Sequence, residues 1–144
     1  MGTQDSFVGT WRLVTYYLDR QDGERFYPFG EDAVGYLTYQ EDGYMSAGFQ
    51  KAGRSAFASE TMSKASGDEA LAAMQTHYSY CGKYEVFSDK IVHHVEVSSF
   101  PNWTGSTQER QYFFEGNRLT LRPAPRVVDG VQRTGVQLTW ERVE

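Results

Sequence analysis

Residues 9–19 read Gly-Thr-Trp-Arg-Leu-Val-Thr-Tyr-Tyr-Leu-Asp, a run in which most side chains are aromatic or β-branched. Such side chains fit the pleated surface of a β-strand, and the Asp22-Gly23 pair that follows is typical of a turn. Alternation places Trp11, Leu13, Thr15 and Tyr17 on one face of the strand, and Arg12, Val14, Tyr16 and Leu18 on the other. We expect the Trp11 face to point inward, because the Arg12 guanidinium needs water. The run predicts the first strand of an all-β fold.

The rest of the sequence alternates expected strands with turns. Residues 33–40 and 44–50 flank Glu41-Asp42-Gly43, which is typical of a tight hairpin. Ser66 is a candidate N-cap for a helix over residues 68–77, which would either close one end of a barrel or connect two strands. Further strands are expected at residues 78–87, 90–100, 104–115, 117–122 and 135–143. Residues 123–132 contain two prolines and are expected to form a long loop.

About eight strands with local connections are typical of one architecture. We expect an all-β fold: an eight-stranded antiparallel up-and-down β-barrel with one short helix between its third and fourth strands. A sandwich of two sheets is the competing architecture. The 144 residues fit one domain spanning residues 1–144, and the 15% of aromatic residues favours an aromatic interior.

Charge and cysteine usage limit the partners and the location of the protein. The net charge is −5 and basic residues are scattered among acidic ones, so we expect no nucleic-acid partner. Cys81 is the only cysteine, and the first residues lack the basic and apolar regions of a signal peptide. No apolar run approaches the roughly 20 residues of a membrane-spanning helix. These features predict a cytoplasmic protein without a membrane span.

Five segments in order carry a resemblance to a known family. They are Gly9-Thr10-Trp11-Arg12-Leu13, residues 35–39 with 42–46, residues 93–96, Pro101-Asn102-Trp103 with Gly105, and residues 116–121. In these segments the chain resembles the bacterial and fungal lipocalin-like domain proteins, and more distantly the lipocalins. The resemblance implies a barrel plugged at one end by Trp11 and open at the other to a small apolar ligand. It also implies an arginine packed over Trp11, for which Arg142 and Arg122 are the candidates.

The adjacent histidines His93 and His94 must point to opposite faces of their strand. Ile91, Val95 and Val97 share a face with His93, so we expect His93 inside, where it would act as a general base together with Tyr80 or Tyr84. The alternative is a core histidine that is hydrogen-bonded to a tyrosine. The opposite register would place His94, Glu96 and Ser98 inside.

The remaining candidate residues are expected to contact a ligand. Tyr78, Tyr80 and Tyr84 share a face that we expect to point inward, as does Tyr17, and Trp103 lies in a bend at the expected barrel rim. Arg110 shares a face with Gln108, Tyr112 and Phe114. If that face is interior, Arg110 needs a buried carboxylate such as Glu96 or an anionic ligand. The alternative is a solvated Arg110 with Glu109 inward. The ligand-binding candidates are therefore Trp103, Tyr17, Tyr78, His94, Glu96 and Arg110.

The leading functional hypothesis is binding of a small hydrophobic molecule, aromatic or polyketide-like, in the barrel interior. The second is a cofactor-free isomerase or cyclase in which His93, Tyr80 and Tyr84 move a proton. The third is a non-enzymatic barrel that is either purely structural or forms a homodimer, for which the expected outer residues Tyr16 and Leu18 leave room. No metal or cofactor is expected, because the three histidines do not have the spacing of a metal site.

Overall fold

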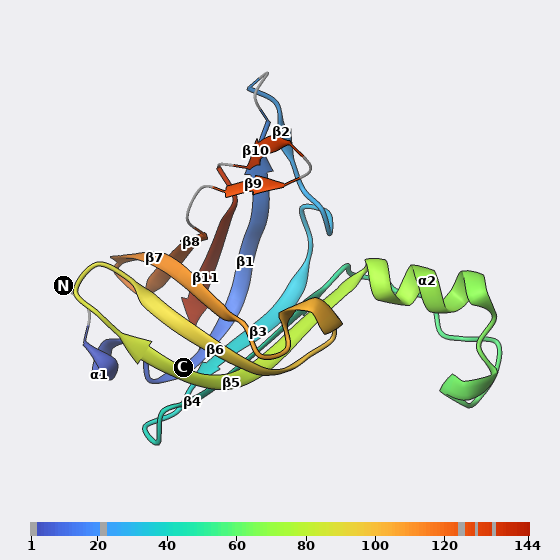
Figure 1. The fold of residues 1–144 in the computed structure, drawn as a ribbon, viewed down its shortest axis with the longest axis horizontal. Helices are drawn as coiled ribbons and strands as arrows, with labels where there is room; N and C mark the ends of the chain where they lie inside the picture. Colours follow the sequence, from blue (N-terminus) through green and yellow to red (C-terminus); the bar gives the residue numbers. More distant parts are fainter. Residues whose placement is uncertain (1–2, 21–22, 124–125, 129, 134) are drawn as a thin grey trace.

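The computed structural model describes residues 3–20, 23–123, 126–128, 130–133 and 135–144, and it forms a closed antiparallel β-barrel (Figure 1). The nine-stranded sheet has the order β11-β8-β7-β6-β5-β4-β3-β1-β2, and β11 also pairs with β1. Eight strands close the barrel. The ninth strand, β2, pairs antiparallel with the last two residues of β1. The strands are β1 (Gly9–Asp19), β2 (Arg25–Phe26), β3 (Val34–Tyr39), β4 (Tyr44–Gln50), β5 (His77–Val86), β6 (Ile91–Ser98), β7 (Thr107–Glu115), β8 (Arg118–Pro123) and β11 (Gln137–Arg142). The predicted barrel is confirmed and the sandwich is not formed.

Several short elements were not expected from the sequence. Part of the loop expected at residues 123–132 belongs to a separate hairpin of β9 (Arg126–Val128) and β10 (Val131–Arg133). The first described residues form α1 (Gln4–Phe7), and single-turn 3-10 helices occur at Met62–Lys64 (η1) and Pro101–Trp103 (η2). Of the predicted Asp22-Gly23 turn, Asp22 lies outside the described residues.

The helix α2 (Gly67–Gln75) begins as predicted at Ser66. The backbone N–H of Glu69 donates to the Ser66 hydroxyl at 3.1 Å, and the Ser66 N–H donates to the Glu69 carboxylate at 3.0 Å, which forms a capping box. None of the α2 residues is buried, and the helix projects away from the barrel (Figure 1). In this structure α2 is part of a connection between β4 and β5 and does not close an end of the barrel.

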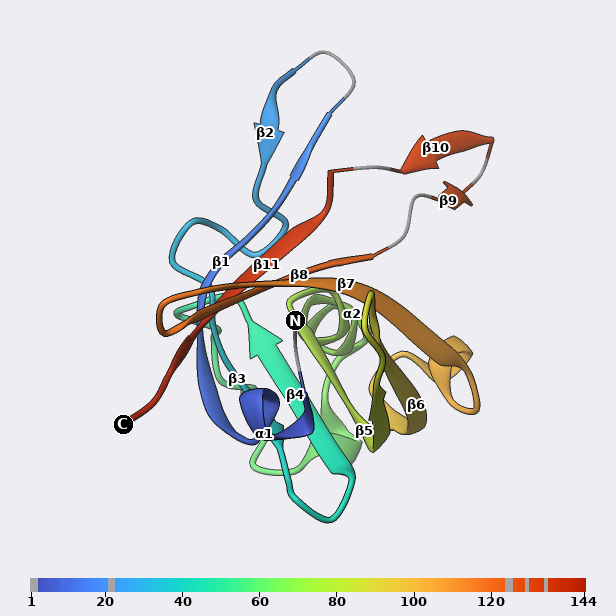
Figure 2. The same ribbon diagram turned by 90° about the vertical axis from the view of Figure 1, so that its left-hand side faces the viewer.

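The two ends of the barrel carry connections of different length. At one end, short turns join β3 to β4, β5 to β6 and β7 to β8, and α1 lies over this end (Figure 2). We call it the turn end. The connections from β1 to β3, β4 to β5, β6 to β7 and β8 to β11 are longer, and because successive strands run in opposite directions they leave the barrel at its other end. We call this the loop end.

The turn end is plugged by Trp11, which is 1% exposed. Its indole N–H donates to the Phe7 carbonyl oxygen at 2.9 Å. The Arg142 guanidinium lies 4.2 Å from the Trp11 ring centroid and donates to the carbonyl oxygens of Val8 and Ser6 at 2.8 and 2.7 Å. Of the two candidate arginines, Arg142 therefore covers Trp11. Arg122 instead lies over Phe113, at 4.7 Å from the ring centroid.

Replacing Arg142 with glutamine is expected to lower the free energy of unfolding by about 2 kcal/mol. The change removes the cation–π contact with Trp11 and two charge-assisted hydrogen bonds, although water can reach part of the site. Urea unfolding followed by tryptophan fluorescence measures the loss. Arg122→Gln is the matched control and should change stability by less than about 0.5 kcal/mol. Equal effects of the two substitutions would show that Arg142 has no special role in the plug.

A β-bulge between Leu13 and Thr15 reverses the inward face of β1. Trp11 and Leu13 are buried as predicted, but beyond the bulge Tyr16 packs on the core and contacts the rings of Phe29 and Phe49. Tyr17 instead lies under the Arg25 guanidinium, at 3.8 Å from its ring centroid. The predicted inward position of Tyr17 and outward position of Tyr16 are therefore wrong, because strict alternation does not allow for the extra residue.

No helix in the described part of the chain is long and apolar enough to span a membrane.

Candidate functional site

The centre of the barrel contains a histidine held between two tyrosines. β6 directs Ile91, His93 and Val95 inward, and His93 is 1% exposed. The Tyr39 hydroxyl lies 2.6 Å from His93 Nε2, and the Tyr80 hydroxyl lies 2.7 Å from His93 Nδ1. A neutral imidazole has one N–H and one acceptor nitrogen, so one tyrosine accepts a hydrogen bond from the ring and the other donates one to it. We call Tyr39, His93 and Tyr80 the triad.

The triad is uncharged at neutral pH. Burial, with a smaller contribution from the positive charge of Arg110, lowers the pKa of His93 from 6.5 to about 3. Burial also raises the pKa of Tyr39 well above 10.0 and raises that of Tyr80. An imidazole with so low a pKa, and with both nitrogens in hydrogen bonds, is a weak proton acceptor. These hydrogen bonds match the second of the two roles considered for His93, a core histidine that is hydrogen-bonded to tyrosine, and not the role of a general base.

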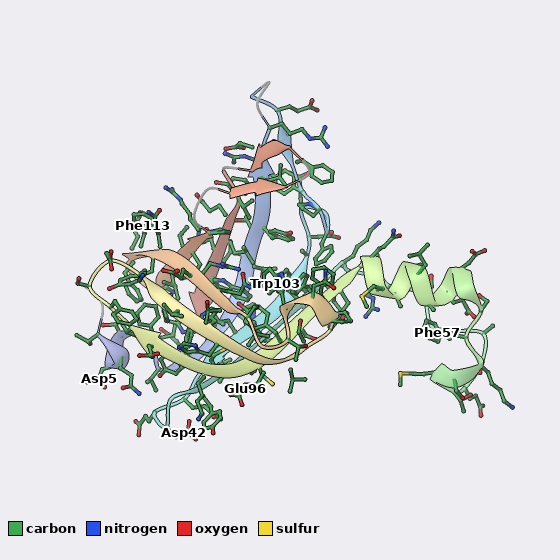
Figure 3. The ribbon with its side chains drawn as sticks, in the orientation of Figure 1. Asp5, Asp42, Phe57, Glu96, Trp103 and Phe113 are labelled. Atoms are coloured by element: carbon green, nitrogen blue, oxygen red, sulfur yellow. The ribbon has the colours of Figure 1, made fainter. Side chains whose placement is uncertain are left out.

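A group of aromatic rings extends from the triad toward the loop end, and we call Trp103, Tyr78 and Phe49 the aromatic wall. Trp103 is carried by η2 at this end of the barrel (Figure 3). Its ring centroid lies 5.0 Å from that of Tyr78 and 5.7 Å from that of Tyr80. Tyr78 in turn stacks on Phe49 at 5.8 Å with an interplanar angle of 7°. A flat apolar molecule that reached this wall would find ring faces and edges with which to pack.

Arg110 faces the interior beside this wall. In the pairing of β6 with β7, Arg110 lies opposite Ile91 and Gln108 lies opposite His93, so both share the inward face. Gln108 is 8% exposed, and the Arg110 guanidinium lies 5.6 Å from the Trp103 ring centroid. The Glu109 side chain is on the outer face, where it pairs with Lys90. Of the two arrangements considered for this strand, the structure has Arg110 inside.

Several other predicted site residues make no hydrogen bond to His93, although the Tyr84 ring contacts that of Tyr39 at 4.8 Å. His94 is on the outer face, where its Nε2 lies 2.6 Å from the Glu85 carboxylate. Glu96 is exposed on the outside of the barrel (Figure 3), so it does not supply the buried carboxylate considered for Arg110. The Tyr84 hydroxyl donates to the Gln40 carbonyl oxygen at 2.7 Å and is not bonded to His93. The register with His94 and Glu96 inside is wrong, because β6 buries its Ile91 face. Beyond the register shift between β5 and β6 the faces exchange, so Val97, which was expected inside, is 63% exposed, and Ser98 lies opposite the inward-facing Tyr80.

Two interior residues, Tyr39 and Trp140, were not predicted as site residues, because no local sequence pattern distinguishes them from other aromatic residues of the strands. Tyr39 ends β3 and meets His93 only because the barrel brings β3 and β6 face to face. Trp140 of β11 is 2% exposed and lies opposite Leu13 and Leu119 on the inward side. Its indole N–H has no hydrogen-bond acceptor among the described residues, and it contacts Phe49 edge to face at 6.2 Å. An unpaired buried N–H favours a ligand that carries an acceptor oxygen.

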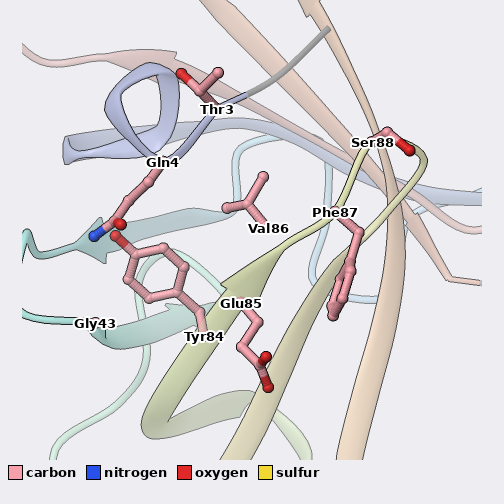
Figure 4. A pocket seen from close by; sticks show the side chains of 8 residues that line it. All are labelled: Thr3, Gln4, Gly43, Tyr84, Glu85, Val86, Phe87 and Ser88. Atoms are coloured by element: carbon pink, nitrogen blue, oxygen red, sulfur yellow. The ribbon is translucent and has the colours of Figure 1, made fainter.

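A separate pocket of about 510 Å³ lies at the turn end (Figure 4). It is lined by Thr3, Gln4, Gly43, Tyr84, Glu85, Val86, Phe87 and Ser88. None of the triad residues lines it. Within the described residues, no three His, Cys, Asp or Glu side chains are grouped closely enough to hold a metal ion.

Comparison with known proteins places these features in context. The lipocalin-like domain family matches residues 8–143. A 4'-hydroxy-3'-methoxypropiophenone carrier protein from Aspergillus oryzae is 36% identical over 86 residues, which cover 53% of this chain and 77% of that protein. Among solved structures, a redesigned β-barrel has a TM-score of 0.46 at 13% identity and covers 98% of this chain and 95% of its own. An uncharacterized protein from Bacteroides eggerthii has a TM-score of 0.47 at 12% identity and covers 95% of this chain and 99% of its own.

Proposed function

This chain belongs to the lipocalin-like domain family, and we propose that it binds and carries a small hydrophobic, aromatic molecule in its barrel. The carrier protein that it resembles is named for a substituted phenyl ketone, and we propose a ligand of that size and character here. The loop end is the proposed entrance, because the turn end is plugged by Trp11 and covered by α1.

The observation that carries this proposal is the aromatic wall beside a set of polar groups. Trp103, Tyr78 and Phe49 offer ring surface near the loop end, and the triad supplies hydroxyl groups deeper in the barrel. Pockets for small molecules typically combine such apolar surface with a few fixed polar groups that orient the ligand. The proposed ligand lies with its ring against the wall and its oxygen atoms toward the polar groups.

The chemistry of His93 favours binding over catalysis. Proton transfer at neutral pH is most efficient when the base has a pKa near the working pH. The pKa of His93 is lowered to about 3, and its two nitrogens are engaged by Tyr39 and Tyr80. Tyr84, the other tyrosine considered for the reaction, is bonded to a backbone carbonyl group. We therefore propose that the triad positions a ligand through its hydroxyl groups and does not abstract a proton from it.

Isothermal titration with 4'-hydroxy-3'-methoxypropiophenone tests the proposal. We expect saturable binding with one site per chain, and we expect Trp103→Ala to weaken it about tenfold or more, because a ring at the centre of a binding surface contributes strongly. Phe113→Ala is the matched control: Phe113 is 47% exposed on the outer face and should leave the affinity unchanged within about twofold. The proposal fails if neither this ketone nor related phenyl compounds bind, or if both variants weaken binding equally.

A further inference from the structure

The Arg110 guanidinium faces the barrel interior but makes few hydrogen bonds. Its Nη1 donates to the carbonyl oxygen of Glu109 at 3.0 Å, and its Nη2 lies 3.5 Å from Gln108 Oε1, at the limit of a hydrogen bond. No carboxylate of the described residues lies within 4.0 Å of it. A guanidinium has several N–H donors in a planar fork, so most of its donors are free for another group.

Three other arginines, Arg25, Arg118 and Arg142, have more complete partners. Arg25 pairs with Asp19 at 2.9 Å, Arg118 pairs with Glu141 at 3.4 Å, and Arg142 donates to two backbone carbonyl oxygens. Arg110 also faces the barrel interior, where removing a charge from water is unfavourable without a partner, but unlike Arg25 and Arg118 it has no carboxylate, and unlike Arg142 it has only one close backbone acceptor. A half-buried arginine without an acid is therefore a feature that needs an explanation.

Among the described residues, no carboxylate pairs with Arg110 to balance its charge. Its positive charge is close enough to the triad to lower the pKa of His93 and to oppose the upward shifts of Tyr39 and Tyr80. The triad itself is neutral, and the Trp103 ring interacts with the guanidinium through its face, at 5.6 Å from the ring centroid. The Arg110 guanidinium therefore lies on the inward face of the barrel, beside Trp103 of the aromatic wall.

We propose that the ligand carries an acidic oxygen, either a carboxylate or an acidic phenol, and that Arg110 pairs with the resulting oxyanion. The planar guanidinium forms paired hydrogen bonds with an anionic oxygen group, while the ring of the ligand lies against Trp103. Gln108 helps to orient the guanidinium through its Oε1. This inference rests on the proposed binding of an aromatic molecule and specifies its chemical class: an aromatic acid or acidic phenol.

Three probes that differ in one group separate the possible sources of the oxyanion. Veratrate carries a carboxylate, methyl veratrate is its neutral ester, and methyl vanillate is a similar ester with a phenol in place of one methoxy group. Their affinities are measured by isothermal titration with wild-type protein, Arg110→Gln and the matched control Arg122→Gln. Arg122 lies on the neighbouring strand β8 and covers Phe113 on the outer face. Thermal unfolding checks that each variant is folded.

We expect veratrate or methyl vanillate to bind the wild-type protein about tenfold more tightly than methyl veratrate, and Arg110→Gln to remove that preference. Preference for veratrate identifies a carboxylate. Preference for methyl vanillate identifies a phenol, whose bound form should show phenolate absorption at a pH where the free compound is neutral. Arg122→Gln should retain the wild-type preference.

Two results would overturn this inference, and they differ in what they say about the proposed function. If all three probes bind with equal affinity and Arg110→Gln has no effect, the protein binds aromatic molecules but does not select acidic ones. If none of the probes binds, and the ketone of the preceding test also fails to bind, the proposed function fails as well.

Discussion

The free energy of unfolding is expected to fall by about 3 kcal/mol between pH 6.5 and about pH 4 through His93 alone. The pKa of His93 is about 3 in the folded protein, against 6.5 in the unfolded chain. Between these two values the unfolded state binds a proton that the folded state does not bind. The stabilising contribution of neutral His93 is therefore complete above pH 6.5 and is lost as the pH falls toward the folded pKa.

Urea unfolding at a series of pH values measures this loss when wild-type protein is compared with His93→Gln. A glutamine amide can both donate to and accept from the hydroxyls of Tyr39 and Tyr80, but it does not titrate. We expect the stability of His93→Gln to depend less on pH than that of the wild type, by about 3 kcal/mol over the same interval. Parallel pH profiles for the two proteins would show that His93 is not held neutral inside the barrel.

Gly82→Ala is expected to destabilise the protein by about 3 kcal/mol or more, through a clash of backbone atoms. A Cβ at Gly82 would lie 1.8 Å from the carbonyl oxygen of His94 and 3.1 Å from the Glu96 nitrogen. The clash arises at a register shift between Cys81 and Gly82, where β5 approaches β6 closely. Because β6 also carries His93, relief of the clash would displace the triad.

Gly48→Ala, in β4, is the matched control for this substitution. A Cβ at Gly48 would have Ser79 Cβ at 3.8 Å as its nearest neighbour, which is an ordinary contact. We expect a change in stability of less than about 1 kcal/mol, since alanine loses less backbone freedom than glycine on folding. Chemical unfolding of the two variants, followed by circular dichroism, measures the difference. Equal stabilities for Gly82→Ala and Gly48→Ala would contradict the close approach of β5 and β6.

Much of the fold could be predicted from local sequence patterns. Alternation and turn signals located the barrel strands to within a few residues, and Ser66 marked the start of α2 because an N-cap preference is a local signal. The errors have specific causes. The bulge at Leu13 to Thr15 exchanged the roles of Tyr16 and Tyr17, and a period-two pattern contains no signal for it. The β9–β10 hairpin occupies a segment whose two prolines favoured a loop.

The candidate site was harder to predict because it depends on contacts between distant strands. Apolar neighbours in β6 were enough to place His93 inside, and Tyr80 was assigned to the inward face of its strand. Tyr39 is 54 residues from His93, and no local pattern relates the two. Arg110 was left with an inward and an outward alternative, because only the register of β7 against β6 determines which face it shares. Pairing register is a property of the closed barrel and cannot be obtained from one strand.

The central claim is that a small aromatic molecule binds in the barrel against Trp103. Solution NMR of the protein bound to the aromatic ketone of the titration tests this claim most directly, through contacts between protons of the ligand and of the protein. We predict contacts from the ligand ring to the side chains of Trp103 and Tyr78. Contacts confined to the outer pocket at the turn end, near Val86 and Phe87, would contradict the account.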